Sequence, residues 1–378
     1  MKNSSMEQCI LKSDGDYSRL DSLFCRVKRV MLVCGKSIEK QKINAYLLEL
    51  QKHTDKKFIR FSDFTPNPDY SSVVNGVRLF REHNCDAIVS IGGGSAIDVA
   101  KCIKLYSNMD IDGEEGSFLK TKIIPNCIPF LVVPTTAGTG SEATRFAVIY
   151  YKGNKQSVAD DSCIPETVLL DSSFLKTLPL YQKKATMLDA LCHAIESFWS
   201  VNSTDESKVY SRNAIQKIIR YADSYLNNKD EGNSVMLEAA NLAGKAINIT
   251  QTTAGHAMCY KLTCLFGCAH GHAAALCVRV LFKWMVDNLD KCTDKRGNTY
   301  LKNTMDDLGK SLGCSDARAG AEFFNKFFVS LELEIPSATV LQLDELKSSV
   351  NPVRLKNHPI ALDEKTILEL YKKILKEI

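Results

Sequence analysis

Residues 86–101 are DAIVSIGGGSAIDVAK, and this stretch indicates how the first half of the chain folds. Asp86–Ile91 is a short apolar, β-branched run typical of a buried strand, and Ala96–Tyr106 has the apolar spacing of a helix. Between them stand Gly92, Gly93, Gly94 and Ser95. Such a loop lets backbone amides approach a phosphate at the positive end of the helix, although a tight turn needs the same residues. The spacing differs from the GxGxxG dinucleotide fingerprint.

A second loop follows another strand-like run, Phe130–Val133, in the sequence FLVVPTTAGTGSEAT. Glycines keep this loop open, and its hydroxyl side chains are those of Thr135, Thr136, Thr139 and Ser141. Hydroxyls interleaved with glycine suit hydrogen bonds to the phosphates and carboxamide of a nucleotide. Taken alone, the loop could also be a solvated connection.

Strand-like and helical patterns alternate over the first part of the chain. Arg29–Cys34 and Lys57–Phe61 are further strand-like runs, and helical spacing follows each of them. This alternation, which continues to about Asp171, predicts a Rossmann-like parallel sheet with flanking helices. Helical patterns dominate after Ser172. We therefore expect an α/β nucleotide-binding domain at residues 1–172 and an all-helical domain at 173–378, and 378 residues provide enough chain for both.

Composition limits the classes of partner. The chain is 45% hydrophobic and 24% charged, as in an ordinary soluble enzyme, and its net charge of +4 comes without a basic stripe, which argues against nucleic-acid binding. No run approaches the roughly 20 apolar residues that cross a bilayer. The first residues, MKNSSMEQCILKSDGD, lack the apolar core of a signal peptide, and the fourteen cysteines are scattered. We expect a cytoplasmic protein.

One carboxylate and three histidines form a candidate metal site. In LDALCHAIESFW, Asp189 and His193 stand four residues apart, on one face of an expected helix. His256 in GHAMCY and His270 in AHGHAA would complete four ligands. This set suits Fe²⁺ or Zn²⁺ better than Mg²⁺ or Ca²⁺. Any one of these residues alone could instead satisfy local hydrogen bonds, and the nearby Cys259, Cys264 and Cys268 are better explained as small core residues than as competing ligands.

Together, GGGSAIDVAK, PTTAGTGSEAT and the four candidate ligands resemble the iron-containing, or group III, alcohol dehydrogenases. The resemblance extends from the strand at Arg29 to the last helix. It implies a dehydroquinate synthase-like architecture, in which a nucleotide-binding domain precedes a metal-binding domain and the active site lies in the cleft. It also implies a homodimer, NADH or NADPH as cofactor, and Asp189, His193, His256 and His270 as metal ligands. The cofactor contacts would be Gly35, Asn67, Gly93, Gly94, Ser95, Asp98, Thr135, Thr136, Thr139, Ser141 and Lys155.

The residue at the end of the first strand bears on cofactor choice. Relatives that prefer NADH often carry an acidic residue there, whereas this chain has Gly35 followed by Lys36. Loss of a repulsive carboxylate should permit NADPH. Gly35 could alternatively serve only to form a turn.

The proton donor departs from the family pattern. Many members have a histidine four residues beyond the third ligand, where this chain has Tyr260. A tyrosine can donate a proton or hold a water, although its unperturbed pKa of about 10 makes it a less ready shuttle at neutral pH. His272 is the other candidate. Both could also simply line the pocket.

The segment TTAGHAMCYKLTCLFGCAHGHAAALC is similar to a branch associated with phosphonate metabolism, the phosphonoacetaldehyde reductases. That branch reduces its aldehyde to 2-hydroxyethylphosphonate, a chemistry that needs cationic donors for a dianion. Arg145, Lys261 and Arg279 are candidates, or are surface charges. The alternatives are a general primary alcohol dehydrogenase, a dehydroquinate synthase-like lyase, whose ligands would be one glutamate and two histidines, and a non-catalytic binding protein.

Overall fold

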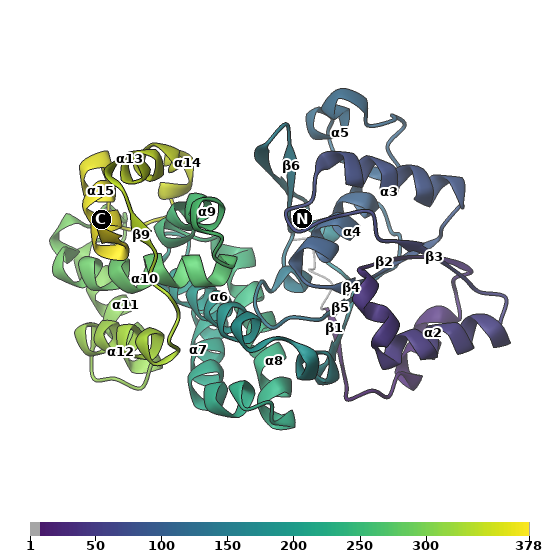
Figure 1. Cartoon of the computed structure of the whole chain (residues 1–378), viewed down its shortest axis with the longest axis horizontal. Helices are drawn as coiled ribbons and strands as arrows, with labels where there is room; N and C mark the ends of the chain where they lie inside the picture. The colour runs from purple at the N-terminus through teal and green to yellow at the C-terminus, as the bar shows by residue number, and fades with distance from the viewer. Residues whose placement is uncertain (1–7, 378) are drawn as a thin grey trace. The chain divides into compact units, whose positions relative to one another are not determined.

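The computed structural model describes residues 8–377, and the chain divides into two compact units (Figure 1). The first unit runs to Thr136 and also includes Gly140–Thr177. The second consists of Ala137–Thr139 and the chain from Leu178 onward. The loop at 135–141 therefore contributes residues to both units.

A six-stranded parallel sheet forms the centre of the first unit, as expected. Its strand order is β1-β8-β5-β4-β2-β3, and every neighbouring pair is parallel. The strands are β1 (Cys9–Ser13), β2 (Arg29–Cys34), β3 (Lys57–Phe61), β4 (Ala87–Gly92), β5 (Phe130–Pro134) and β8 (Thr167–Asp171). Sequence patterns did not indicate β1, whose residues are exposed or half-buried because it lies at the edge of the sheet.

Helices cover both faces of this sheet, which explains why its central strands are apolar throughout. Met31 and Val33 of β2 lie in one core with residues of α3 (Tyr70–Glu82) and α4 (Gly94–Tyr106). Val30 and Leu32, which point to the opposite face, lie in a second core with residues of α2 (Lys42–His53). Two shorter helices, α1 (Asp21–Phe24) and α5 (Ser117–Lys120), complete the unit.

A β-hairpin interrupts the predicted alternation of strands and helices. It consists of β6 (Phe146–Tyr151) and β7 (Asn154–Ala159), which pair antiparallel in a sheet of their own. The two residues of its turn, Lys152 and Gly153, both have positive φ, 51° and 75°. Such two-residue turns match the twist of paired strands. The alternation that was expected to continue to about Asp171 is therefore broken at this hairpin.

The second unit is built mainly of helices, as expected. They are α6 (Leu180–Trp199), α7 (Asp205–Leu226), α8 (Asp230–Thr250), α9 (Ala254–Phe266), α10 (His270–Asp287), α11 (Asn298–Ser311), α12 (Ala317–Ser330), α13 (Val340–Ser349), α14 (Pro352–Leu355) and α15 (Glu364–Ile374). Helix α6 packs against α7, α8 and α10 and is almost entirely buried from Ala185 onward. The unit is not wholly helical, because β9 (Ser337–Ala338) and β10 (Lys376–Glu377) form a short parallel pair.

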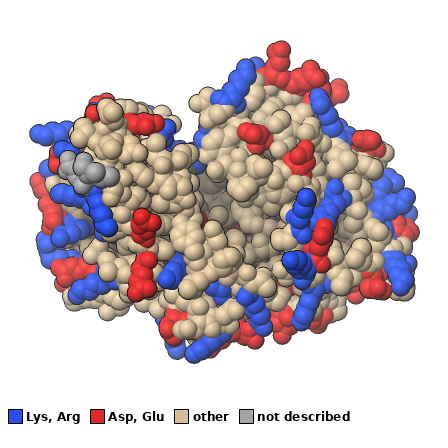
Figure 2. All heavy atoms as spheres, viewed as in Figure 1, with Lys and Arg blue, Asp and Glu red and all other residues tan. Residues whose placement is uncertain are grey.

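The molecular surface carries charges of both signs. On the face shown in Figure 2, lysine and arginine side chains are interspersed with aspartate and glutamate. Among the described residues, no helix combines the length and hydrophobicity of a membrane span. All fourteen cysteines are unpaired.

Candidate metal centre and nucleotide site

Three imidazole nitrogens surround one carboxylate oxygen in the second unit. Oδ1 of Asp189 lies 3.5 Å from Nε2 of His256, 3.9 Å from Nε2 of His193 and 4.0 Å from Nε2 of His270. Asp189, His256 and His270 each bring one ligand atom to within 4.8 Å of the others. The oxygen–nitrogen distances exceed those of hydrogen bonds and approach the roughly 3.4 Å between two ligands of one tetrahedral ion. The predicted group is thus brought together, with His193 stacked on His256 at 4.4 Å between ring centroids.

Burial shows that these residues fit a metal. Oδ1 of Asp189 and Nε2 of His256 are buried and have no hydrogen-bond partner. A buried polar atom left unsatisfied costs about 1–3 kcal/mol, and a divalent cation would satisfy both atoms at once. A donor set of one carboxylate and three imidazoles suits Fe²⁺ or Zn²⁺.

The titration behaviour of the cluster agrees with a ligand role. Burial lowers the pKa of His193 to about 4 despite the nearby Asp189, so its ring is neutral at pH 7 with a nitrogen lone pair available. Burial alone would also lower the pKa of His256, but Glu196 and Asp189 raise it to about 9. Burial opposes ionisation of Asp189, yet the surrounding histidines hold its pKa below the ordinary value. At pH 7 the metal-free ring of His256 is therefore protonated between two carboxylates, and a metal ion would have to displace its Nε2 proton.

Two glycines allow the helices that carry these histidines to approach α6 closely. A Cβ added at Gly271 would lie 2.1 Å from the carbonyl oxygen of Ala185 and 2.5 Å from Cβ of Asp189. One added at Gly255 would lie 2.5 Å from Cγ2 of Val278 on α10 and 3.1 Å from Cδ of Glu196 on α6. Each glycine adjoins a candidate ligand in sequence, and at Gly271, where the contact is with backbone, only glycine lets His270 reach Asp189.

A buried glutamate, missed in the sequence, orients His256. Glu196 is fully buried and accepts hydrogen bonds from Nδ1 of His256, from Thr253 and from the backbone N–H of Gly255. Burial would raise its pKa, but His256 and these hydrogen bonds lower it, so Glu196 is ionised. A carboxylate that accepts from Nδ1 leaves Nε2 to face Asp189. The spacing Asp189-x6-Glu196, two turns along one helix face, was the available signal.

The two candidate proton donors lie in different environments. The ring of Tyr260 stacks on His270, with centroids 5.6 Å apart and planes at 19°. Nδ1 of His272 lies 3.2 Å from the hydroxyl of Tyr181, and its ring packs against Phe328. Tyr260 is thus in contact with the cluster, whereas no contact is seen between His272 and Asp189. Their catalytic roles stay predictions.

The three predicted substrate cations all have partners within the fold. Arg145 forms an ion pair with Asp161 at 3.3 Å in the first unit. In the second unit, Lys261 forms one with Glu345 at 2.6 Å. The guanidinium of Arg279 donates to side-chain and backbone oxygens of Asn325 and Ile374. A fourth cation was missed: Nη1 of Arg354 donates to the hydroxyl of Tyr260 at 3.3 Å.

The glycine loop lies where a parallel sheet normally binds a nucleotide. From β2 the chain moves to β3 on one side and then to β4 on the other, so the strand order reverses between β2 and β4. Ligands of such sheets bind beyond the carboxyl ends of the strands at this point. Gly35 follows β2, and the N-terminus of α4 follows β4. The loops after β4 and β5 adjoin there, and the predicted residues that they bring together are Gly93, Gly94, Ser95, Thr135 and Thr136.

The other predicted cofactor residues are placed differently. The carboxylate of Asp98 is half-buried and accepts from Oγ of Ser141 at 2.6 Å and from the backbone of Val148 at 3.0 Å. Asp98 and Ser141 thus attach the hydroxyl loop to α4. Lys155 is half-buried on β7, and Asn67 is exposed with a left-handed backbone, φ 57°. Thr139 is half-buried in the stretch that belongs to the second unit.

The position of Gly35 does not itself require glycine. Its backbone is extended, with φ −76° and ψ 171°, and an added Cβ would meet only Oγ of Ser37 at 3.9 Å. The chain does turn here, because the Gly35 carbonyl accepts from the backbone N–H of Ile38 at 3.4 Å, so the alternative that Gly35 only forms a turn stays a prediction. Arg60, which sequence analysis missed, donates to the Gly35 carbonyl at 3.0 Å and to Glu39. A cation that is paired with the carboxylate of Glu39 therefore adjoins the end of β2.

Comparison with known proteins identifies the family. The family model "Iron-containing alcohol dehydrogenase" matches residues 8–172, and "Fe-containing alcohol dehydrogenase family, C-terminal" matches residues 183–375. The chain belongs to the iron-containing alcohol dehydrogenase family.

Among individual relatives, phosphonoacetaldehyde reductase of Streptomyces viridochromogenes is 31% identical over 268 residues, which cover 68% of this chain and 67% of the relative. The aldehyde-alcohol dehydrogenase of Streptococcus pneumoniae is 29% identical over 69% of this chain, which spans only 31% of that longer protein.

Solved structures agree on the fold. An iron-containing alcohol dehydrogenase from Thermotoga maritima superposes with a TM-score of 0.82 at 25% identity, and the match covers 98% of both chains. The sulfoacetaldehyde reductase from Bifidobacterium kashiwanohense, solved in complex with NAD⁺, gives 0.85 at 23% identity over 98% of this chain and 97% of that one. The expected architecture is thereby confirmed.

Proposed function

We propose that this protein is a metal-dependent NAD(P)H oxidoreductase that reduces phosphonoacetaldehyde to 2-hydroxyethylphosphonate. The observation that carries the enzymatic assignment is the placement of three Nε2 atoms around Oδ1 of Asp189. The 31% identical phosphonoacetaldehyde reductase supports the choice of substrate. A general primary alcohol dehydrogenase is the alternative, because other relatives include alcohol dehydrogenase 4 of Schizosaccharomyces pombe.

Different residues of the chain have different roles in the proposed reaction. Asp189, His193, His256 and His270 would hold a divalent ion, which when bound would supply Lewis-acid polarisation of the aldehyde carbonyl. Backbone amides at the start of α4 bind the pyrophosphate of the nicotinamide cofactor, which supplies the hydride. The hydroxyl of Tyr260 accepts a hydrogen bond from Arg354 and belongs to the ring that stacks on His270, and it would donate the proton to the product oxygen.

We further propose that NADPH is accepted beside NADH. A carboxylate at the end of β2 would repel a 2′-phosphate. This chain has Gly35 at that position instead, although a side chain would fit there. The guanidinium of Arg60 lies at the same place and is of the sign that a 2′-phosphate requires.

A panel of aldehydes with NADH and NADPH on Fe²⁺-loaded protein tests the assignment. We expect kcat/KM for phosphonoacetaldehyde to exceed that for propanal by about two orders of magnitude or more, since charge-assisted contacts contribute roughly 1.5–3 kcal/mol each. Equal efficiency with propanal would make the protein a general alcohol dehydrogenase. Conversion without net consumption of NAD(P)H would instead point to a lyase.

The role of the metal needs a separate measurement. His256→Ala should remove most bound metal, determined by elemental analysis, together with nearly all turnover. Full activity with undiminished metal content would refute the assignment of the centre.

A further inference from the structure

Tyr260 connects the candidate metal centre to a cation from a distant part of the chain. It follows His256 by one helical turn in α9 and stacks on His270. On this same tyrosine, Cζ of Arg354 lies 5.2 Å from the ring centroid, and Nη1 donates to the hydroxyl at 3.3 Å. Arg354 is therefore one aromatic ring away from a candidate ligand.

The charge of Arg354 is not neutralised within the fold. Among residues 8–376, no carboxylate lies within ion-pair distance of it, and its hydrogen bond goes to the hydroxyl of Tyr260. By contrast, Lys261 on the same helix as Tyr260 has Glu345 at 2.6 Å. Arg354 is half-buried, so its cation loses hydration without gaining a counter-ion. A guanidinium has five N–H donors, and most of those on Arg354 are left to bind another group.

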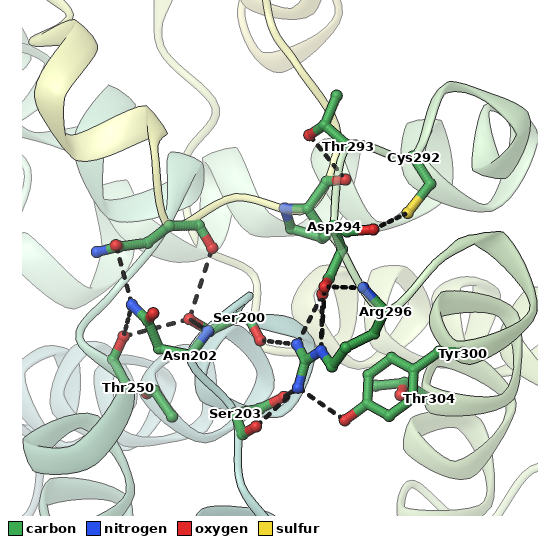
Figure 3. A network of polar contacts seen from close by, with 12 residues as sticks. Ser200, Asn202, Ser203, Thr250, Cys292, Thr293, Asp294, Arg296, Tyr300 and Thr304 are labelled. Atoms are coloured by element: carbon green, nitrogen blue, oxygen red, sulfur yellow. Dashed lines mark hydrogen bonds and ion pairs between the residues drawn. The ribbon is translucent and has the colours of Figure 1, made fainter.

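Hydrogen bonds of Asn357 hold the segment that carries Arg354. The carbonyl oxygen of Asn357 accepts from the backbone of Val201 at 3.1 Å, and its side chain donates to Gln251 and Thr252. Figure 3 shows the surrounding network, in which Ser200 and Asn202 lie beside Thr250, and Arg296 reaches Asp294, Ser203 and Tyr300. Because Asn357 is held in this way, the backbone near Arg354 is positioned before any ligand arrives.

We propose that Arg354 is the specificity-determining residue that binds the anionic head group of the aldehyde substrate, with Tyr260 orienting its guanidinium. This inference rests on the proposed function and extends it to a substrate class: short aldehydes that carry a tetrahedral oxyanion, phosphonate or sulfonate, on the neighbouring carbon. A guanidinium offers two parallel N–H groups to two oxygens of such a head, a geometry that a lysine cannot provide. The aldehyde end of the same short molecule is then directed toward the Asp189 cluster.

The test compares Arg354→Gln with Lys356→Gln, a control that removes an exposed cation from the same segment. We expect Arg354→Gln to lower kcat/KM for phosphonoacetaldehyde about 10- to 100-fold more than kcat/KM for propanal, mainly through KM, and to leave metal content unchanged. Arg354→Lys should recover only part of the loss. In calorimetry, phosphonoacetate should bind metal-loaded Arg354→Gln at least about tenfold more weakly than the wild type.

The possible negative results distinguish a failure of the proposed function from a failure of the role of Arg354. If the wild-type protein reduces neither anionic nor neutral aldehydes with either nucleotide, the proposed function fails and this inference fails with it. If the wild type prefers phosphonoacetaldehyde or sulfoacetaldehyde but Arg354→Gln keeps that preference, the proposed function stands and the role of Arg354 is refuted. If Lys356→Gln lowered kcat/KM for phosphonoacetaldehyde as much as Arg354→Gln did, the role of Arg354 would likewise be refuted. The same would follow if Lys261→Gln lowered it and Arg354→Gln did not.

Discussion

His256 donates its Nδ1 proton to the fully buried carboxylate of Glu196. This pair fixes the tautomer of the imidazole, because an ionised carboxylate can only accept. The opposite nitrogen, Nε2, faces Asp189 and would offer its lone pair to a metal once its own proton is displaced. Orientation of a ligand by a second carboxylate is common at metal sites, where it also raises the basicity of the imidazole.

Glu196→Gln should weaken metal binding while the protein still folds. The amide preserves the size of the side chain but removes the charge that holds the Nδ1 proton, and loss of such a partner typically costs about 10–100-fold in metal affinity. The measurement is the dissociation constant for Zn²⁺ from chelator competition, with thermal melting as a check on folding. Unchanged affinity in Glu196→Gln would show that the pair serves stability alone.

Gly271→Ala should separate α10 from α6. The new methyl would overlap the backbone oxygen of Ala185, which cannot move aside as a flexible side chain can, so His270 must shift away from Asp189. We expect reduced metal content and a loss of about 1–3 kcal/mol in the free energy of unfolding. Cys264→Ala, at an exposed position of α9, is the control and should change neither quantity. Normal metal content in Gly271→Ala would contradict the close-approach argument.

Gly93→Val should act on the cofactor and not on the metal. A Cβ at this position meets Thr136 at 3.4 Å, which is an ordinary contact, and the backbone of Gly93 is extended, so the fold should tolerate the change. The larger side chain would occupy the approach to the amides of α4, and the apparent KM for NAD(P)H should rise about tenfold or more. Nucleotide titration by fluorescence, alongside metal analysis, measures both effects. A wild-type KM would place the pyrophosphate elsewhere.

His358 should make the protein sensitive to acid. Its ring is buried against Trp199, both nitrogens lack hydrogen-bond partners, and burial lowers its pKa to about 4, with Glu196 only partly opposing this. The unfolded chain, with an ordinary pKa near 6.5, takes up the proton first. The contribution of His358 to the free energy of unfolding is therefore fully present above about pH 6.5. It decreases as pH falls toward 4, by up to roughly 3 kcal/mol.

The variant His358→Phe isolates this effect. It should flatten the pH dependence of the unfolding free energy between pH 6.5 and 4, measured by urea denaturation, whatever constant offset the larger ring introduces. Parallel curves for the wild type and the variant would show that His358 does not titrate in this way.

Much of the fold could be predicted from the sequence alone, because it depends on the local pattern of apolar residues and glycines. Arg29–Cys34 is apolar at nearly every position, and only a strand covered on both faces accommodates such a run, so the parallel sheet could be predicted. Asp189 and His193 share a helix face because four residues make about one turn. The glycines before α4 likewise indicate a phosphate-binding loop, because their chemistry is local.

Tertiary structure alone decided what lies around these elements. Nothing in the local periodicity shows that Gly271 must contact Asp189, or that Arg354 lies against Tyr260 at a sequence separation of 94 residues. The predicted cations Lys261 and Arg279 have plausible positions in sequence, yet their side chains have partners elsewhere. The physical reason is that periodicity specifies which face of an element is apolar, whereas close packing between distant helices specifies which polar groups meet.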